Sequence, residues 1–287
     1  MTGTRDISAG IKTFMRTDKL RLCLGSLVQH EWHEVIVADD GPMDEEREQL
    51  YREFAERAPL KVLRLPFDTG LSAGRNEIVR QCATPYLLML DDDQTVPANV
   101  GRLVEVLDEN PAIGGVSAIW LEHGVRKCTA CDIRLVGSKV VKEVREHRPI
   151  RQTSLGQRFV TFDFIPNSTL FRKECLTDSP WDPFYKIGRE HLDFYLSQQR
   201  LGRWQFAVSL DVIVGHHPDT SAAGYKEFRH GERIRVSDQY FLQKFGLSDV
   251  VEGRKLHDDW GAFEDSATHP SAIGRLFAGI RHRARHV

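Results

Sequence analysis

The chain has 287 residues, of which 41% are hydrophobic and 28% are charged, and its formal net charge at pH 7 is −2. This length and apolar content exclude a disordered chain and allow either one elaborated α/β domain or a domain with an added lobe. The near-zero net charge gives no overall attraction for nucleic acid, so we expect no nucleic-acid partner.

The two ends of the sequence bear on where the protein acts. The first residues lack the charged-then-apolar pattern of a secretory signal, and no apolar run is long enough to span a bilayer, so we expect a cytoplasmic protein. The last residues are basic, with Arg281, Arg283 and Arg285 following an apolar segment. They are compatible with a weak peripheral membrane contact or with a solvated terminus.

The first 120 residues alternate short apolar runs with helical patterns. The apolar runs predict strands at Ile11–Met15, Val35–Ala38, Lys61–Leu65, Tyr86–Leu90 and Gly115–Trp120. The helical patterns predict helices at Asp18–Gln29, Glu45–Arg57, Ser72–Cys82 and Val100–Glu109. This order is typical of βαβ units, and it predicts an α/β fold with a mostly parallel central sheet flanked by helices.

The second half of the chain has a mixed pattern. Residues 121–160 lack a helical period and predict an irregular or hairpin-bearing insertion. The segments that follow predict a strand at Phe159–Phe164, a helix at Glu190–Leu201, a strand at Trp204–Val214 and a helix from about Tyr225 to Phe245. Gly202 and Gly246 are expected to end the two helices.

Three consecutive carboxylates, Asp91, Asp92 and Asp93, follow the apolar run Leu87–Leu90. Because unpaired acids cannot be buried, they must lie at the exit of the strand. Strand alternation then points Asp91 and Asp93 to one side and Asp92 to the other. Two convergent carboxylates suit Mg²⁺ or Mn²⁺, and Mg²⁺ commonly bridges carboxylates and substrate phosphates. The alternative is a solvated acidic turn before the next helix.

Further polar residues follow the neighbouring strands, and parallel strands bring such ends to one crevice. They are Thr13 and Arg16 after the first strand, Asp39 and Asp40 after the second, and the segment 68–76 after the third. Asp39 or Asp40 could accept from a base or ribose, Gly74 allows close backbone approach, and Arg75 could bind a diphosphate. Each also has a purely structural interpretation, as a turn residue, loop glycine or surface ion pair.

Four motifs resemble the nucleotide-binding half of GT-A glycosyltransferases of family 2. They are Ile11-Lys12-Thr13-Phe14-Met15-Arg16, Val35-Ile36-Val37-Ala38-Asp39-Asp40-Gly41, Gly70-Leu71-Ser72-Ala73-Gly74-Arg75-Asn76 and Asp91-Asp92-Asp93, in family order. The third motif and Glu190-His191-Leu192-Asp193-Phe194 are also similar to β-1,4-N-acetylgalactosaminyltransferases of the ganglioside-synthase type. The resemblance implies a GT-A, Rossmann-like fold, with residues 1–120 as the nucleotide-sugar-binding half, residues 121–250 as the acceptor half of the same domain, and residues 251–287 as a C-terminal extension.

The resemblance also implies a UDP-sugar donor, and Mn²⁺ or Mg²⁺ as cofactor. The second similarity implies that the donor is a UDP-N-acetylhexosamine. It places Asp39 near the uracil, Asp91 on ribose or metal, and Asp93 as the principal metal ligand. Another ligand often follows the last core strand, which here implies His217 or His216. The implied donor contacts are Thr13, Phe14, Arg16, Asp39, Asp40, Gly74, Arg75, Asp91 and Asp92.

A transfer to an acceptor hydroxyl needs a carboxylate that removes its proton. Family 2 enzymes usually show Gly-Glu-Asp at the corresponding helix, whereas this chain has Arg189-Glu190-His191-Leu192-Asp193. We expect Glu190 to be the base, with Asp193 second and His191 third, in an inverting single displacement. Two alternatives stay open: a sugar-phosphate nucleotidyltransferase, which should carry a glycine-rich first loop that Thr13–Asp18 lacks, and a non-catalytic nucleotide-sugar-binding module. The acceptor is not identifiable from the sequence.

Overall fold

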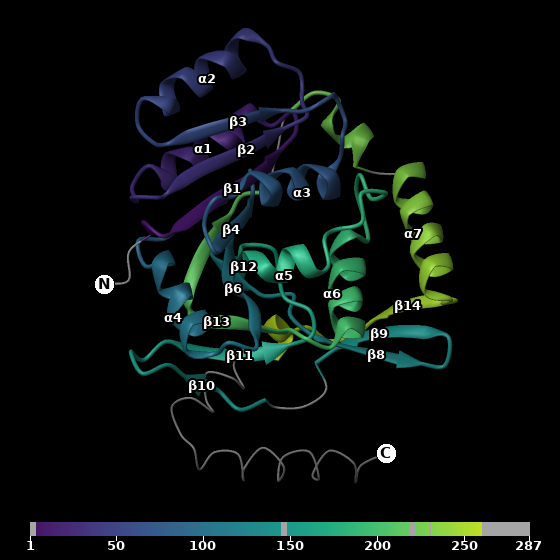
Figure 1. The fold of residues 1–287 in the computed structure, drawn as a ribbon. Coiled ribbons are helices and arrows are strands. Elements are labelled where there is room, and N and C mark those ends of the chain that lie inside the picture. Colours follow the sequence, from purple (N-terminus) through teal and green to yellow (C-terminus); the bar gives the residue numbers. More distant parts are fainter. Residues whose placement is uncertain (1–3, 145–147, 219–221, 230, 260–287) are drawn as a thin grey trace.

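A computed structural model describes residues 4–144, 148–218, 222–229 and 231–259, and within them helices cover a large mixed sheet (Figure 1). From edge to edge this sheet contains β10 (Arg151–Gln152), β11 (Arg158–Phe162), β13 (Gln205–His216), β6 (Ile113–Glu122), β12 (Thr169–Arg172), β4 (Tyr86–Asp91), β1 (Ile7–Thr13), β2 (Glu34–Asp39) and β3 (Leu60–Arg64). Two short strands extend it: β5 (Gln94–Thr95), which pairs with β13, and β7 (Val125–Lys127), which pairs with β6.

The helices contribute to two hydrophobic cores, one on each face of the sheet. One core contains side chains of α1 (Thr17–Leu27), α2 (Glu45–Ala55), the 3₁₀ turn η1 (Val100–Arg102) and α4 (Leu103–Glu109). The other contains side chains of α3 (Leu71–Gln81), α5 (Lys173–Asp178), α6 (Glu190–Leu201) and α7 (Glu232–Phe245). None of the described helices is both long enough and apolar enough to cross a membrane.

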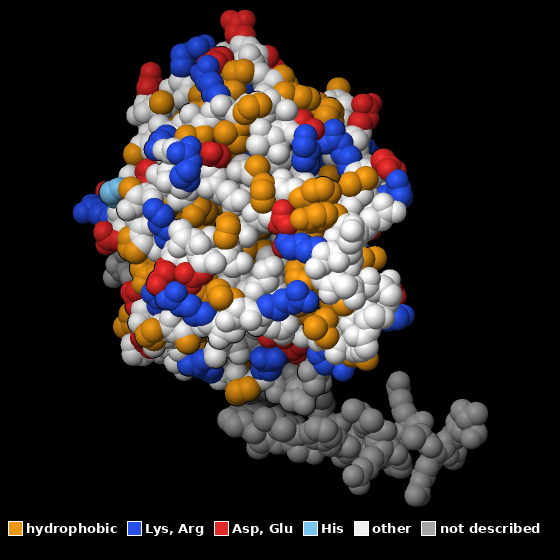
Figure 2. All heavy atoms as spheres, turned by 45° about the vertical axis from the view of Figure 1, so that its right-hand side comes forward, with side chains coloured by type: hydrophobic (Ala, Val, Ile, Leu, Met, Phe, Trp, Pro, Cys, Tyr) orange, Lys and Arg blue, Asp and Glu red, His pale blue; other side chains and the backbone are white. Residues whose placement is uncertain are grey.

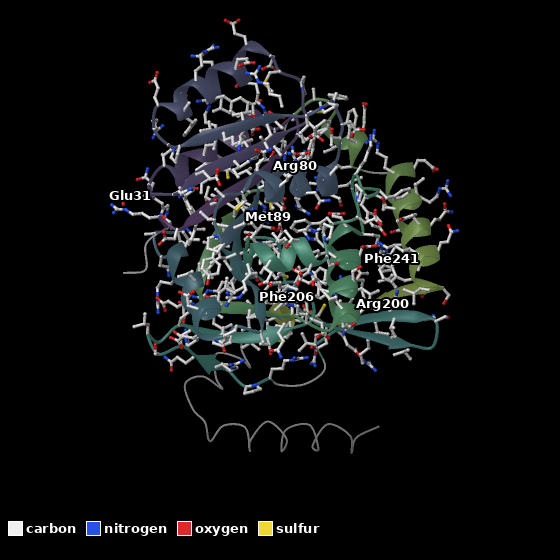
Figure 3. All side chains as sticks on the ribbon, in the orientation of Figure 1. Glu31, Arg80, Met89, Arg200, Phe206 and Phe241 are labelled. Atoms are coloured by element: carbon white, nitrogen blue, oxygen red, sulfur yellow. The ribbon has the colours of Figure 1, made fainter. Side chains whose placement is uncertain are left out.

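Strand β4 shows why its sequence forms a buried central strand. Leu87 and Met89 enter the core of α3 and α6, whereas Leu88 and Leu90 enter the core of α1 and α4. Because successive side chains point to opposite faces, an unbroken apolar run is buried on both sides. Met89 of β4 and two other residues labelled in Figure 3, Phe206 of β13 and Phe241 of α7, belong to the same core.

The predicted elements of the first 120 residues are confirmed, with shifts at their ends. The first strand begins earlier than predicted, at Ile7, and stops at Thr13, because Met15 has a φ of 61° and so leaves the extended region. Strands β4, β1, β2 and β3 are parallel. Strand β12, which the sequence did not predict, lies antiparallel between β4 and β6 and makes the sheet mixed.

The insertion predicted at residues 121–160 contains the expected hairpin. Strands β8 (Asp132–Val136) and β9 (Lys139–Glu143) are antiparallel, and β14 (Asp249–Glu252) adds to β9 to form a separate three-stranded sheet. In the hairpin turn, Gly137 has a φ of 58°, which glycine adopts without steric cost.

The helix predicted from about Tyr225 to Phe245 is divided in the structure. The 3₁₀ turn η2 (Tyr225–Phe228) precedes α7, and Gly231, with a φ of 70°, precedes the first residue of α7. The predicted glycine stops are confirmed, because Gly202 and Gly246 cap α6 and α7 in the left-handed conformation. A last 3₁₀ turn, η3 (Leu256–Asp259), ends the described chain, so the basic segment at residues 281–285 lies outside the described residues.

The surface has mixed charge. On the face shown in Figure 2, Lys and Arg side chains are interspersed with Asp and Glu side chains, as a net charge near zero predicts.

Candidate active site

A cavity of about 370 Å³ lies where β1, β4 and β13 end and where α3 and α6 begin. It is lined by Lys12, Thr13, Phe14, Arg16, Leu71, Arg75, Asp91, Asp92, Asp93, Trp120, Glu190, His191, His216, Pro218, Tyr225 and Arg229. Polar residues from far apart in the sequence therefore meet at one edge of the sheet, which is where open α/β sheets bind ligands.

The acid triplet divides into two parts. Strand β4 ends at Asp91, whose Oδ1 accepts from Nη2 of Arg75 at 2.9 Å. Asp92 and Asp93 follow in a turn, and both accept from Arg16, with 2.6 Å between Nη1 and Oδ2 of Asp93. Strand alternation does not extend through the triplet, because β4 ends at Asp91. All three acids line the cavity, and Arg16 pairs Asp92 with Asp93.

These contacts set different pKa values for neighbouring acids. Burial acts to raise the pKa of Asp91, but the opposing charge of Arg75 holds it well below its usual range. Burial raises the pKa of Asp92 to about 6, although the charge of Arg16 acts to lower it. The cavity therefore presents one strongly ionised carboxylate, that of Asp91, beside two acids that share the Arg16 guanidinium.

Asp39 and Asp40 lie behind the cavity wall and are not among the residues that line it. Asp39 is buried and accepts from Tyr51 and from Nε of Arg47 at 2.7 Å. Asp40 accepts from Lys12 and from the backbone N–H of Gly70 at 2.7 Å. In this structure both residues anchor the surrounding loops, so a direct contact between Asp39 and a nucleobase would require rearrangement of these bonds.

Gly74 also has a packing role. A Cβ atom at this position would lie 2.4 Å from Cδ of Lys12. The glycine therefore lets the Lys12 side chain cross α3 and reach Asp40, whereas the sequence had suggested close approach to a ligand. Burial lowers the pKa of Lys12, while Asp40 acts in the opposite direction.

Glu190 and Asp193 lie on the same first turn of α6 but in different surroundings. Glu190 lines the cavity, is only 6% exposed, and its Oε2 atom has no hydrogen-bond partner. Asp193 is outside the cavity lining: it accepts from the Tyr185 hydroxyl at 2.9 Å and from Lys244 at 2.8 Å. The carboxylate available to a bound molecule is therefore that of Glu190.

His191 lies between Glu190 and Arg75. Its Nε2 atom is 3.7 Å from Oε1 of Glu190 and 3.4 Å from Nη1 of Arg75. Burial lowers the pKa of His191 to about 4, and the Arg75 charge acts in the same direction. The imidazole is therefore neutral near pH 7.

The structure distinguishes the two adjacent histidines at the end of β13. His216 lines the cavity, with Nδ1 2.6 Å from Oε2 of Glu122 and Nε2 3.8 Å from Oδ2 of Asp93. His217 is outside the cavity lining, and its Nε2 atom lies 3.2 Å from the Thr95 hydroxyl. Of the two predicted ligands, only His216 faces the acid pair.

The described residues contain no group of three or more His, Cys, Asp or Glu side chains arranged for a metal ion. Two donors are nevertheless suitable. Oδ1 of Asp93 is buried without a hydrogen-bond partner, and Nε2 of His216 is an imidazole nitrogen, a ligand type that suits Mn²⁺. The site thus fits a cation that takes its remaining ligands from a bound substrate.

Several lining residues were not assigned a role from the sequence. Trp120 stacks on His216 at 4.5 Å between ring centroids, and the ring of Tyr225 lies 4.9 Å from the Arg16 guanidinium carbon. Arg229 also lines the cavity. The signal for Trp120 was its place at the end of a predicted strand, but Tyr225 and Arg229 lie beyond the matching motifs and had no such signal.

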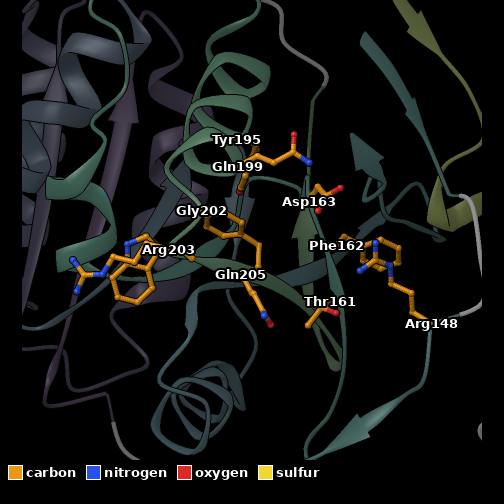
Figure 4. A pocket seen from close by; sticks show the side chains of 11 residues that line it. Arg148, Thr161, Phe162, Asp163, Tyr195, Gln199, Gly202, Arg203 and Gln205 are labelled. Carbon is orange, nitrogen blue, oxygen red and sulfur yellow. The ribbon is translucent and has the colours of Figure 1, made fainter. Parts of the chain in front are cut away.

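A second cavity, of about 340 Å³, lies at the opposite end of β13, around Gln205 and Phe206 (Figure 4). Its two arginines are engaged elsewhere: Arg148 pairs with Asp132, and Arg203 pairs with Glu174 and Asp178. It contains none of the acids singled out from the sequence.

Comparison with known proteins agrees with this geometry. The family model for glycosyl transferase family 2 matches residues 8–176. Human beta-1,4 N-acetylgalactosaminyltransferase 1 is 28% identical over 217 residues, which are 73% of this chain and 38% of that protein. An uncharacterized glycosyltransferase of Haemophilus influenzae is 30% identical over 95 residues, covering 32% of this chain and 36% of its own length. The matched part of this chain thus covers well under half the length of either relative.

Solved structures share the fold. The crystal structure of S. aureus TarS 1–349 superposes with a TM-score of 0.55 at 17% identity, covering 74% of this chain and 60% of that chain. The same protein in complex with UDP-GlcNAc gives a TM-score of 0.54 at 16% identity, over 76% of this chain and 61% of that chain. The architecture is that of GT-A glycosyltransferases, and the family match covers more than half of the chain. This chain belongs to glycosyl transferase family 2.

Proposed function

We propose that this chain transfers an N-acetylhexosamine from a UDP-sugar to an acceptor hydroxyl, by a single displacement that inverts the anomeric carbon and requires Mn²⁺ or Mg²⁺. Three comparisons support the donor: the family 2 match, the relatives named as N-acetylgalactosaminyltransferases, and the structural neighbour solved with UDP-GlcNAc. The observation that carries the proposal is the buried, unpartnered carboxylate oxygen of Glu190 in the same cavity as Asp91, Asp92 and Asp93.

Asp93 and His216 would hold the cation, which supplies charge neutralisation at the leaving diphosphate. Arg75 lies buried in the cavity wall beside Asp91 and can donate to diphosphate oxygens through its remaining N–H groups. The aromatic ring of Phe14, which also lines the cavity, lies close to those of Phe67 and Phe228, at 5.4 and 5.1 Å between centroids. These groups would bind and orient the donor.

Glu190 would take the proton from the acceptor hydroxyl. Its Oε2 atom accepts no hydrogen bond from the protein and can therefore accept the proton of the hydroxyl. The neighbouring His191 is neutral, so it places no positive charge beside the carboxylate. A single carboxylate base is what an inverting displacement needs.

The test is an assay of UDP release from UDP-GalNAc and UDP-GlcNAc with a panel of hydroxyl acceptors, with and without Mn²⁺. Glu190→Gln should reduce kcat by about 10²-fold or more, the usual range for loss of a general base, while UDP binding measured by calorimetry stays near that of the wild type. Unchanged turnover in this variant would exclude Glu190 as the base. Formation of UTP and sugar 1-phosphate from the UDP-sugar and added pyrophosphate, without release of UDP, would instead identify a nucleotidyltransferase.

A further inference from the structure

The guanidinium of Arg16 already neutralises the acid pair. It donates from Nη1 to Asp93 and from Nη2 to Asp92, and its side chain is only 8% exposed. In the charge balance of the cavity, Arg16 supplies the positive charge that a cation at Asp93 would otherwise supply.

Two features hold Arg16 in this position. The ring of Tyr225 faces the guanidinium at 4.9 Å, a distance that favours a cation–π contact. The preceding residue, Met15, has a φ of 61°, which is sparsely populated for residues other than glycine. Because β1 ends at Thr13 and α1 begins at Thr17, this unusual backbone conformation sets the direction of Arg16.

The same geometry offers two metal donors beside Arg16 but makes binding of a metal unfavourable in the empty protein. Oδ1 of Asp93 has no partner, and Nε2 of His216 lies 3.8 Å from Oδ2 of the same carboxylate. A divalent ion bound there would lie within a few ångströms of the guanidinium, and like charges at that separation repel strongly in a buried site. A nucleoside diphosphate would relieve this repulsion, because its oxygens can both ligate the ion and accept from Arg16.

We infer that Arg16 makes binding of the divalent cation conditional on binding of the nucleoside diphosphate. Without nucleotide, Arg16 occupies Asp92 and Asp93 and opposes a second cation. With nucleotide, the added negative charge draws the guanidinium toward the diphosphate and frees the carboxylates. The inference rests on the proposed function, because it takes Asp93 and His216 as the metal ligands.

The test measures Mn²⁺ binding directly, by counting free Mn²⁺ with electron paramagnetic resonance in titrations with and without UDP. A protein-free UDP and Mn²⁺ series gives the baseline. The wild type should bind Mn²⁺ at least about tenfold more tightly when UDP is present. In Arg16→Gln, Mn²⁺ affinity without UDP should rise about tenfold or more, and the enhancement by UDP should shrink.

Arg21→Gln is the matched control, since it removes an exposed positive charge from α1, the helix that follows Arg16, where Arg21 pairs with Glu53. It should bind Mn²⁺ as the wild type does. If Arg16→Gln does not fold, the double variant Arg16→Gln/Asp92→Asn removes Arg16 together with one of its two carboxylate partners, so the net charge of the cluster is unchanged. It should also bind Mn²⁺ more tightly than the wild type without UDP.

The failures of the two proposals can be told apart. UDP-dependent Mn²⁺ binding in the wild type, with unchanged values in Arg16→Gln, overturns the role of Arg16 and leaves the proposed metal site intact. A wild type that binds no Mn²⁺ even with UDP removes metal dependence from the proposed function. Because no nucleotide-dependent binding is then left for Arg16 to control, that result overturns the inference as well, whatever Arg16→Gln binds.

Discussion

Arg75 donates from Nη2 to Oδ1 of Asp91 across 2.9 Å, and this ion pair joins α3 to the end of β4. The other terminal nitrogen of Arg75 lies 3.4 Å from Nε2 of His191 at the start of α6. One planar guanidinium therefore connects the acid after the central strand with the helix that carries the proposed base.

The geometry predicts that Arg75→Lys weakens UDP binding. A guanidinium can donate to Asp91 and to a diphosphate oxygen at the same time, because its N–H groups form a rigid fork. A lysine ammonium lacks this geometry. We expect the Kd for UDP, measured by calorimetry, to rise by about tenfold or more. Arg80→Lys is the control, because Arg80 lies exposed on the same helix in an ion pair with Glu77. Wild-type affinity in Arg75→Lys would restrict Arg75 to a structural role.

The two histidines at the end of β13 should differ in metal binding. His216 faces Asp93, whereas His217 contacts Thr95. In the presence of UDP, His216→Ala should weaken Mn²⁺ binding by about 10-fold or more, as expected for loss of one ligand. His217→Ala should leave the affinity for Mn²⁺ near the wild-type value. The two adjacent histidines thus provide the variant and its matched control. Equal losses in both variants would contradict the assignment of His216.

Asp193 should affect stability more than turnover. Its carboxylate is paired with Lys244 and accepts from the Tyr185 hydroxyl in a buried setting. Asp193→Asn should lower the free energy of unfolding by about 1–3 kcal/mol in urea denaturation, because it weakens hydrogen bonds to a charged group. Its kcat should stay within a few-fold of the wild type. A stable Asp193→Asn protein with a large loss of kcat would move the base from Glu190 to Asp193.

The lowered pKa of His191 predicts a dependence of stability on pH. An unfolded histidine takes up its proton near pH 6.5, whereas folded His191 resists protonation until about pH 4. Between these values the unfolded state binds more protons, so stability falls as the pH falls, by up to about 3 kcal/mol, and no further below pH 4.

His191→Gln removes this term, so its free energies of unfolding at pH 7 and pH 4.5 should differ less than those of the wild type. Urea denaturation at both values measures the difference. His33→Gln, at an exposed position, should keep the wild-type dependence on pH. An identical pH dependence in His191→Gln would show that His191 does not resist protonation in the folded state.

The strands that carry the cavity were predictable because they are buried on both faces. An unbroken apolar run such as Leu87–Leu90 can be satisfied only by a central strand, and the acids after it must reach the surface of a cavity. The ends of α6 and α7 were also predictable from the sequence, because helices often end at a residue in the left-handed conformation, which favours glycine, as at Gly202 and Gly246.

The partners of the site residues were not predictable, because they depend on side chains brought together by the fold. Nothing in the motif around Asp39 indicates that Arg47 and Tyr51 of α2 would take both of its oxygens. In the same way, the spacing of Arg16 from Asp92 along the chain gives no sign of their contact. The assignment of residues 1–120, 121–250 and 251–287 to separate parts also stays a prediction.

Strand β12 has a consequence for how the chain becomes structured during synthesis. Its residues pair with β4 on one side, from Thr169 opposite Met89, and with β6 on the other, from Thr169 opposite Ser117. Until the ribosome has released Arg172, the inner edge of β4 has no neighbour and exposes free backbone donors and acceptors. A nascent chain shorter than this is thus open to intermolecular strand pairing, and truncated variants that end before Thr169 should aggregate rather than fold.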